Sequence, residues 1–218
     1  MKASILFSGG KDSGLTALLL EPFFDEIELV TFSFGRDEAW RVAASAAAEI
    51  GHPHRRIFFE EGVLEKGLNI LRSTGYPNDA LNYVHSIALE TLADSCEFVA
   101  DGTRRDDRAP KMGPSEIRSF EDRWHVHYLR PLAGLGGKAI RAMARRYLDF
   151  EEEVSERYPA SDFEVGLRYA LTERFGQQEV ERIFPSRHTH TRVIRRKDIV
   201  QEVEGQEDQA CQGIQSES

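Results

Sequence analysis

Short apolar segments alternate with longer amphipathic ones through the first 150 residues of the chain. The short segments are rich in β-branched and aromatic residues and end at glycine or polar residues, as buried strands do. They predict strands at 3–8, 27–34, 55–59, 98–101 and 126–132. Segments whose apolar positions recur every three or four residues predict helices at 12–21, 37–50, 61–73, 79–94 and 138–148.

This alternation predicts an α/β fold with a doubly wound, Rossmann-like, five-stranded parallel sheet. Parallel strands need crossover connections, and crossover helices cover both faces of the sheet. Ligands of such sheets bind at the carboxyl ends of the strands, where the strand order reverses. We therefore expect residues 8–14, the end of the second strand and residues 101–107 to surround one crevice.

Residues 104–124 show almost no apolar periodicity. They carry dense charge of both signs together with Pro110, Gly113 and Pro114. We interpret the segment as a long loop, either functional or disordered, because such loops are uncommon inside compact domains without a role.

The character of the chain changes after residue 150. An acidic run at 151–153 leads into predicted helices at 161–175 and 177–184, and a basic stretch follows at 187–197. The polar tail has too little apolar content to order itself. The sequence thus predicts a main domain at 1–150, a small C-terminal helical extension with the basic segment at 151–203, and a disordered tail at 204–218.

Composition fits a globular protein, with 40% hydrophobic and 30% charged residues. No apolar run approaches the roughly 18 residues of a membrane helix, and the chain enters a strand at once, so we expect no membrane association, no signal peptide and a cytoplasmic location. Cys96 and Cys211 lie far apart without a CxxC pattern, which argues against a disulfide framework or a cysteine metal site. A net charge of −9 argues against a wholly basic nucleic-acid coat but leaves room for a local basic patch.

Residues 8–14 read Ser-Gly-Gly-Lys-Asp-Ser-Gly and join the end of the first strand to a helix N-terminus. Backbone N–H groups and the helix dipole converge there, which favours a phosphate. Gly9 and Gly10 allow close approach, and Ser8 and Ser13 add hydroxyl donors. The spacing does not match the Walker A pattern, because the glycines are adjacent and the lysine follows them directly.

Asp12 stands out in this loop, since a carboxylate beside a phosphate is repulsive. A Mg²⁺ ion that bridges the two resolves the repulsion. Alternatively, Asp12 caps the helix and faces away from the ligand. Lys11 fits either phosphate neutralisation or a position along the surface.

The order Ser-Gly-Gly-Lys-Asp-Ser after the first strand resembles the signature of the PP-loop ATP pyrophosphatases, the N-type, adenine nucleotide α-hydrolase group. This group includes tRNA-thiolation, sulfur-transfer and diphthine–ammonia ligase enzymes. The resemblance covers residues 1–150 and implies a Rossmann-like fold of the HUP type. It also implies that ATP and Mg²⁺ bind and that ATP is cleaved between its α and β phosphates.

Two later segments are also similar to that group. Residues 101–107, Asp-Gly-Thr-Arg-Arg-Asp-Asp, resemble its Gly-Thr/His-x-x-Asp-Asp element, although a solvated charged turn would look the same. Lys138 sits in a Pro-Leu…Lys-x-x-Ile-Arg pattern whose lysine reaches the ATP phosphates in relatives; an ordinary surface lysine fits too. His85 lies on the helix that the resemblance places beside the pocket, but a lone histidine there also fits a structural role.

Together these motifs define the candidate site. The candidate catalytic residues are Lys11, Asp12, Asp106, Asp107 and Lys138. The candidate nucleotide contacts are Ser8, Gly9, Gly10, Lys11, Asp12, Ser13, Phe32, Ser33, Gly102 and Thr103. The candidate metal ligands are Asp12 and Asp107.

The resemblance implies an adenylating enzyme that cleaves ATP to AMP and pyrophosphate and so activates an acceptor for sulfur or nitrogen transfer, with a tRNA nucleoside as the leading acceptor. Alternatives are an amide ligase acting on a small metabolite or protein residue, and an ATP- or AMP-binding regulatory module. The expected partners are a sulfur or ammonia donor protein, a second copy of the chain, and tRNA held through 187–197. That segment equally fits pairing with the acidic run at 151–153 or exposure to solvent.

Overall fold

The five predicted strands form one parallel sheet in the computed structural model, which describes residues 1–35, 38–154, 162–185 and 189–198. The predicted tail at 204–218 and Arg187 of the basic stretch lie outside these residues. The strands are β1 (Lys2–Leu6), β2 (Glu26–Ser33), β3 (His54–Phe58), β4 (Phe98–Ala100) and β5 (His127–Leu129). Their order is β3-β2-β1-β4-β5, so the predicted doubly wound fold is confirmed.

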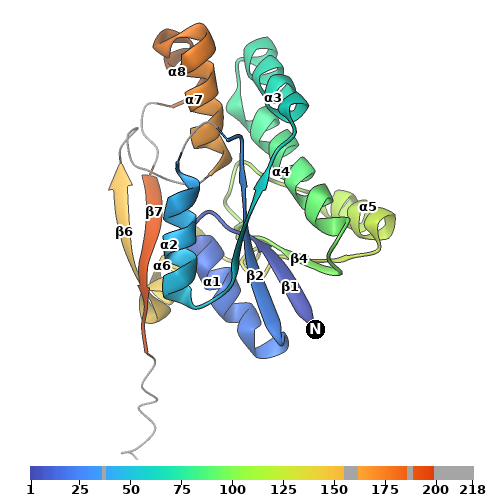
Figure 1. Ribbon diagram of the computed structural model, residues 1–218, viewed down its shortest axis with the longest axis vertical. Helices are drawn as coiled ribbons and strands as arrows, with labels where there is room; N and C mark the ends of the chain where they lie inside the picture. The colour runs from blue at the N-terminus through green and yellow to red at the C-terminus, as the bar shows by residue number, and fades with distance from the viewer. Residues whose placement is uncertain (36–37, 155–161, 186–188, 199–218) are drawn as a thin grey trace, which may run out of the picture.

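Helices cover both faces of the sheet (Figure 1). They are α1 (Lys11–Leu20), α2 (Trp40–Ile50), α3 (Glu61–Thr74), α4 (Pro77–Ala93), α5 (Pro114–Trp124), α6 (Gly137–Tyr147), α7 (Phe163–Phe175) and α8 (Gln177–Ile183), with a 3₁₀ turn η1 at Glu21–Phe23. Helices α1 and α2 pack on one face, and α4 and α5 on the other. No helix of the described residues combines the length and apolar character needed to cross a bilayer.

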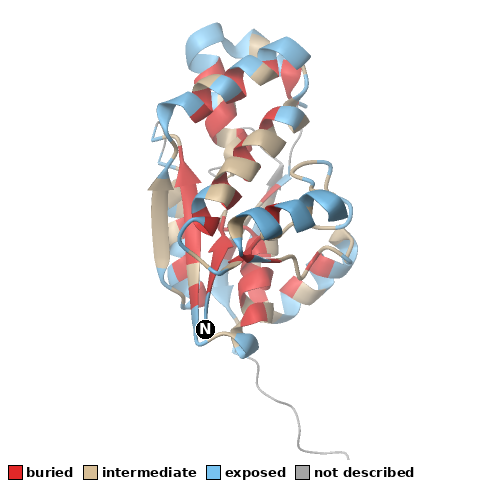
Figure 2. Ribbon diagram, turned by 90° about the vertical axis from the view of Figure 1, so that its right-hand side faces the viewer, coloured by how far each residue is buried: buried red, intermediate tan, exposed pale blue. Residues whose placement is uncertain are grey.

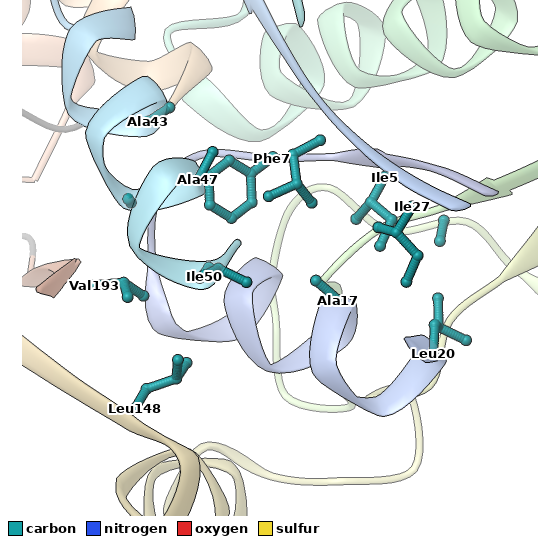
Figure 3. Close-up of a cluster of buried hydrophobic side chains, with 13 residues drawn as sticks. Ile5, Phe7, Ala17, Leu20, Ile27, Ala43, Ala47, Ile50, Leu148 and Val193 are labelled. Carbon is teal, nitrogen blue, oxygen red and sulfur yellow. The ribbon is translucent and has the colours of Figure 1, made fainter. Parts of the chain in front are cut away.

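Successive strand residues supply two separate cores. Figure 3 shows Ile5, Phe7 and Ile27 of the β1–β2 region facing the apolar sides of α1 and α2. Leu6 and Val30 point the other way, toward α4 and α5. Burial on both faces explains why the strands read as continuous apolar runs rather than alternating ones. Figure 2 shows the buried residues gathered in the sheet and on the inward sides of the helices.

The strand order reverses at β1. From β1 the chain steps outward to β2 and β3, then crosses back to place β4 on the opposite side of β1. The loops that leave β1 and β4 therefore diverge to opposite faces and leave a crevice at the carboxyl ends of these two strands. This is the position expected from the sequence for residues 8–14 and 101–107.

The predicted loop at 104–124 requires a correction, because its second half is helix α5. Pro114 occupies the first helical position, where proline is favoured, and the Gly113 N–H donates to the Glu116 carboxylate at 2.6 Å. Periodicity is weak because only Phe120 of this helix is buried, and most of α5 faces solvent (Figure 2).

The C-terminal extension also differs from the prediction. Helices α7 and α8 form where expected, but the acidic and basic stretches form an antiparallel pair of strands, β6 (Leu148–Val154) and β7 (Thr189–Arg196). Leu148 and Val193 of this pair are buried in the core shared by α1 and α2 (Figure 3). Leu167 of α7 is buried with Val63 and Val84 of α3 and α4. The extension therefore packs on the main domain through the α1–α2 core and through a further cluster with α3 and α4.

We expect Leu148→Ala to lower the free energy of unfolding by about 2–5 kcal/mol, because Leu148 is 1% exposed and its loss leaves a cavity against α1. Ile194→Ala on β7 is the control, since Ile194 is 38% exposed and surface substitutions cost about 0.5 kcal/mol or less. Urea unfolding followed by circular dichroism measures both. An unchanged midpoint for Leu148→Ala would show that the β6–β7 pair does not belong to this core.

Candidate functional site

The loop between β1 and α1 lies tightly against α2. Gly9 has a φ of +77°, and a Cβ added there would lie 2.9 Å from the Cα of Ala43. Only glycine meets both constraints without strain. The Ser8 and Ser13 hydroxyl oxygens lie 3.3 Å apart and close the loop on itself. The loop is thus held in shape by its own contacts before any ligand binds.

Strand β7 supports the same loop from the other side. The Val193 N–H donates to the Gly9 carbonyl at 2.9 Å, and the Lys11 N–H donates to the Thr191 hydroxyl at 3.1 Å. A part of the predicted RNA-binding segment therefore holds the loop instead. No local pattern in the sequence indicates this contact, because 180 residues separate Lys11 from Thr191.

Asp12 occupies the first turn of α1 without capping it; the N-cap residue is Gly10, and the Lys11 N–H is taken up by Thr191. Its carboxylate contacts Lys11 Nζ at 3.1 Å and Arg104 Nε at 3.7 Å. The Oδ1 atom is buried and accepts no hydrogen bond, although it lies within ion-pair distance of Lys11. The capping interpretation of Asp12 is therefore wrong, and the carboxylate is available to a cation.

The segment after β4 meets the start of α1. A Cβ added to Gly102 would lie 2.8 Å from the nitrogen of Ser13, so glycine is needed for this approach. The Thr16 hydroxyl donates to the Asp101 carbonyl at 3.3 Å in the same contact. The two sequence motifs, 8–14 and 101–107, are thus brought together as predicted.

A cavity of about 210 Å³ lies between these motifs. Its polar wall includes Ser8, Asp12, Ser13, Thr103 and Asp107. Its apolar wall includes Leu6, Val30, Phe32, Pro110 and Phe163. A concave site with one apolar and one polar side suits a ligand that carries both a planar ring and a polar group.

Asp101 is the centre of a buried hydrogen-bond network at one side of the cavity. Its Oδ1 accepts from the Thr103 N–H at 3.0 Å and from the Thr103 hydroxyl at 2.6 Å. Its Oδ2 accepts from the Tyr128 hydroxyl at 2.5 Å and lies 2.7 Å from His85 Nε2. The network holds the first residues of the 101–107 segment in place.

These contacts determine the charge of Asp101. Burial acts to raise the pKa of this carboxyl, but the hydrogen bond and charge of His85 and the hydrogen bonds of Thr103 and Tyr128 lower the pKa below its ordinary value of 3.8. Burial and the neighbouring Asp101 carboxylate raise the pKa of the Tyr128 hydroxyl well above its ordinary value. Asp101 is therefore an ionised buried acceptor and Tyr128 a neutral donor.

Arg104 contacts the other two acidic residues of the 101–107 segment, Asp106 and Asp107. Its Nε donates to Asp107 Oδ1 at 2.8 Å, and its backbone N–H donates to Asp107 Oδ2 at 2.7 Å. Burial acts to lower the pKa of Arg104, but its hydrogen bond to Asp107 and the charges of Asp12, Asp107 and Asp106 raise it. Asp107 thus faces the cavity with both oxygens already engaged.

Asp106 and Lys138 lie apart from the cavity wall. The Gly137 N–H donates to Asp106 Oδ2 at 2.9 Å, so Asp106 binds the first turn of α6. That backbone hydrogen bond lowers the pKa of Asp106. Lys138 is exposed in the same turn of α6.

Phe32 and Ser33, the two predicted contacts at the end of β2, differ in their relation to the cavity. Phe32 lines the cavity, whereas the Ser33 hydroxyl accepts from the Arg56 guanidinium and the Gly35 N–H, both at 3.0 Å. Ser33 borders a small neighbouring recess with Trp40 and Phe163. Of the two, Phe32 is the residue placed for contact with a ligand ring.

The arginines of the predicted RNA-binding segment are ion-paired. Arg192 contacts Glu151 at 2.8 Å, and Arg195 contacts Asp149 at 2.7 Å across the β6–β7 pair. Arg196 donates to Glu21 of η1 at 2.8 Å. Pairing with the acidic run at 151–153 therefore holds for Arg192, whereas Arg195 and Arg196 pair with acidic residues outside that run.

The donor set at the cavity fits a magnesium ion that also binds phosphate. Within the described residues no group of three or more His, Cys, Asp or Glu side chains forms a protein-only metal site. Mg²⁺ commonly uses one or two carboxylates and takes its other ligands from phosphates and water. The buried Oδ1 of Asp12 meets that requirement, and Asp107 does so only if its contacts with Arg104 yield.

Comparison with known proteins defines the family. Residues 1–195 match the family described as "Family of unknown function (DUF7411)". The chain belongs to this family. An uncharacterized protein of Methanocaldococcus jannaschii is 39% identical over 194 residues, which are 89% of this chain and 96% of that protein.

A solved structure extends the likeness to three dimensions. The crystal structure of a predicted subunit of tRNA methyltransferase from M. jannaschii is 39% identical and superposes with a TM-score of 0.82. The match covers 91% of this chain and 98% of that one. The DUF7411 fold described above is therefore shared over nearly the whole length of that relative.

We expect Asp101→Asn to destabilise the protein at neutral pH, because an amide is a poorer partner for three donors. The folded-state pKa of Asp101 is lowered, so its carboxylate stabilises the fold fully above about pH 5 and progressively less as the pH falls below 3.8. The stability difference between wild type and Asp101→Asn should shrink over that lower range.

Urea unfolding at pH 3 to 7 measures this difference. Asp122→Asn is the matched control, since Asp122 is exposed on α5, and it should change stability little at any pH. A difference for Asp101→Asn that stays constant down to pH 3 would contradict an ionised Asp101 in the folded protein.

Proposed function

We propose that this protein is an ATP-dependent adenylating enzyme of the PP-loop type, which cleaves ATP to AMP and pyrophosphate to activate an acceptor. One observation carries the proposal: the loop at 8–14 and the segment at 101–107 meet at a single cavity, at the carboxyl ends of β1 and β4. Both motifs that resemble the PP-loop enzymes thus line one ligand-sized space.

The two walls of the cavity suggest how ATP lies. The adenine ring packs against the apolar wall, with Val30, Phe32 and Phe163 around it. The phosphates lie at the start of α1, where the Asp12 N–H has no partner among the described residues and the helix dipole favours an anion. Gly102 and Thr103 lie between these walls, beside the ribose and the α-phosphate.

The charge balance of the site explains why a cation belongs there. Lys11 and Arg104 are matched by Asp12 and Asp107, and the ionised Asp101 adds a further carboxylate at the cavity, so the fixed charges there do not attract a polyanion by themselves. A triphosphate brings several negative charges that the protein alone leaves uncompensated. Asp12 would hold Mg²⁺, and Asp107 would join it as a second ligand where its contacts with Arg104 yield. When bound, Mg²⁺ neutralises phosphate oxygens and stabilises the leaving pyrophosphate.

The chemistry then has two steps. An acceptor oxygen attacks the α-phosphorus of ATP, the bond from that phosphorus to the α–β bridging oxygen breaks, and pyrophosphate leaves with the electron pair. A nitrogen or sulfur nucleophile next displaces AMP from the acceptor. The protein contributes positioning and electrostatic stabilisation from Lys11, Arg104 and the α1 N-terminus.

The second nucleophile comes from outside the described residues. Cys96 is the cysteine they contain; it precedes β4, at the amino-end edge of the sheet, and its Sγ lies 3.1 Å from Ser4 Oγ. This edge is opposite to the cavity, so Cys96 cannot deliver sulfur to the α-phosphate. A small donor such as ammonia, or a donor protein, fits the site better.

A tRNA nucleoside is the acceptor that we propose. Support comes from the relative described as a predicted subunit of tRNA methyltransferase, whose fold extends over nearly all of this chain. The same description favours a protein that works within a complex. Methyl transfer itself is not part of the proposal, because the motifs at the cavity resemble those of nucleotide-cleaving PP-loop enzymes.

Release of pyrophosphate from ATP with Mg²⁺ tests the proposal. We expect release that bulk tRNA stimulates, and we expect Asp12→Ala to abolish it, because Asp12 lines the phosphate end of the cavity and its Oδ1 accepts no hydrogen bond. Asp122→Ala is the control, because it removes the same negative charge from an exposed residue of α5.

Three further outcomes separate the alternatives. Release stimulated by a small metabolite and ammonia, but not by tRNA, would indicate an amide ligase. Tight ATP binding without pyrophosphate under any condition would indicate a regulatory module. Full activity of Asp12→Ala would show that the phosphates lie elsewhere.

A further inference from the structure

Helix α6 has a basic face directly opposite its buried face. Ile140 and Ala144 are fully buried, and with Leu15 and Leu132 they form a small core between α6 and α1. At 3.6 residues per turn, Lys138, Arg141, Arg145 and Arg146 project from the other side of the helix. All four are exposed. Figure 1 shows α6 beside α1 on the outer side of the sheet.

The charge of this helix is unbalanced within an acidic protein. Residues 124–148 contain no Asp or Glu, yet they hold Arg130 and the four basic residues of α6, while the whole chain has a net charge of −9. Arg141 contacts Glu152 at 3.1 Å. Lys138, Arg145 and Arg146 have no ion-pair partner in the part of the chain that the structure describes.

The arginines of β7 differ in this respect. Arg192, Arg195 and Arg196 all have carboxylate partners, and β7 also braces the loop at 8–14. Their guanidinium groups are thus paired within the fold. Of the two arginine-rich segments, α6 is the one whose basic side chains, Arg141 apart, lack ion-pair partners among the described residues.

The basic face begins beside the 101–107 segment, part of which lines the cavity. Asp106 binds the Gly137 N–H, so the N-terminus of α6 adjoins the 101–107 segment. Arg105 of that segment is exposed, and its Nη1 donates to the Gly134 carbonyl just before α6. From there the helix extends over about 16 Å. A polyanion lying along α6 would therefore reach the 101–107 segment with one end.

We propose that the basic face of α6, defined as Lys138, Arg141, Arg145 and Arg146, binds the phosphate backbone of the RNA that carries the acceptor nucleoside. The choice of RNA rests on the proposed function. Phosphate contacts by lysine and arginine position a nucleic acid without reading its sequence, which suits a surface that only directs a nucleoside to the cavity. A membrane-surface helix would expose an apolar side, whereas the apolar side of α6 is buried in the core.

The double variant Arg145→Ala/Arg146→Ala tests this surface. Its affinity for bulk tRNA is measured by fluorescence anisotropy without ATP, across a series of KCl concentrations. We expect weaker binding and a plot of log K against log [KCl] whose slope falls in magnitude by about two, since each lost phosphate contact removes about one. Urea unfolding should stay unchanged, because both side chains are exposed.

The matched control is Arg182→Ala/Arg195→Ala, which removes the same charge from two exposed arginines that are ion-paired with Glu179 and Asp149. It should leave the slope nearly unchanged. An equal loss in both double variants would overturn the proposal, because net charge would then explain the binding. Unchanged tRNA affinity of Arg145→Ala/Arg146→Ala would overturn it as well.

Two further measurements separate this proposal from the proposed function. Loss of tRNA binding in Arg145→Ala/Arg146→Ala supports the α6 surface even if wild-type protein releases no pyrophosphate. Conversely, tRNA-stimulated pyrophosphate release that the double variant retains in full would refute the α6 surface and leave the adenylation intact. Binding to anionic phosphatidylserine vesicles that depends on Arg145 and Arg146, with no binding to tRNA, would also refute it.

Discussion

The contact between Gly102 and the start of α1 is the constraint on which the site depends. β4 lies beside β1, and the chain that leaves it must pass within van der Waals distance of Ser13 and Asp12. Any side chain at Gly102 would collide with backbone atoms, which cannot swing aside as a flexible side chain can. The close approach brings Asp101 and its hydrogen-bond partners to within reach of the loop at 8–14. Without it, the two motifs would lie at one sheet edge but would not share a cavity.

The loop is held from a second direction by β7, and this explains why the C-terminal segment is integral to the site. Gly9 accepts a backbone hydrogen bond from Val193, while Thr191 takes up the Lys11 N–H. Because Leu148 and Val193 are buried with residues of α1 and α2, the β6–β7 pair is fixed to the core rather than to the surface. A loop with adjacent glycines has high conformational entropy when unfolded, so contacts on both sides are needed to give it one shape.

The sheet and the two motifs could be predicted from the sequence because their signals are local. Buried parallel strands appear as apolar runs, and a glycine-rich turn between a strand and a helix is a compact, recognisable pattern. The strands β6 and β7 lacked such a signal, since charges paired across the strands replace the usual apolar alternation. Helix α5 could not be predicted because Phe120 is its one buried residue. The Asp101 network could not be predicted because His85, Asp101 and Tyr128 come from three separate elements, and only the fold brings them together.

The availability of basic charge likewise depends on the fold and not on local sequence. The β7 segment and α6 are both rich in arginine, and by sequence the β7 segment looks the more concentrated. Ion pairing neutralises the β7 arginines, because each faces an acidic residue of β6 or η1. An amphipathic helix separates its charges from the core instead, and the absence of acidic residues from 124 to 148 leaves those charges uncompensated.

In a protein of net negative charge, a phosphate backbone is repelled by most of the surface, so such a local excess determines where an RNA can approach. The position of α6 next to the 101–107 segment then links that approach to the cavity.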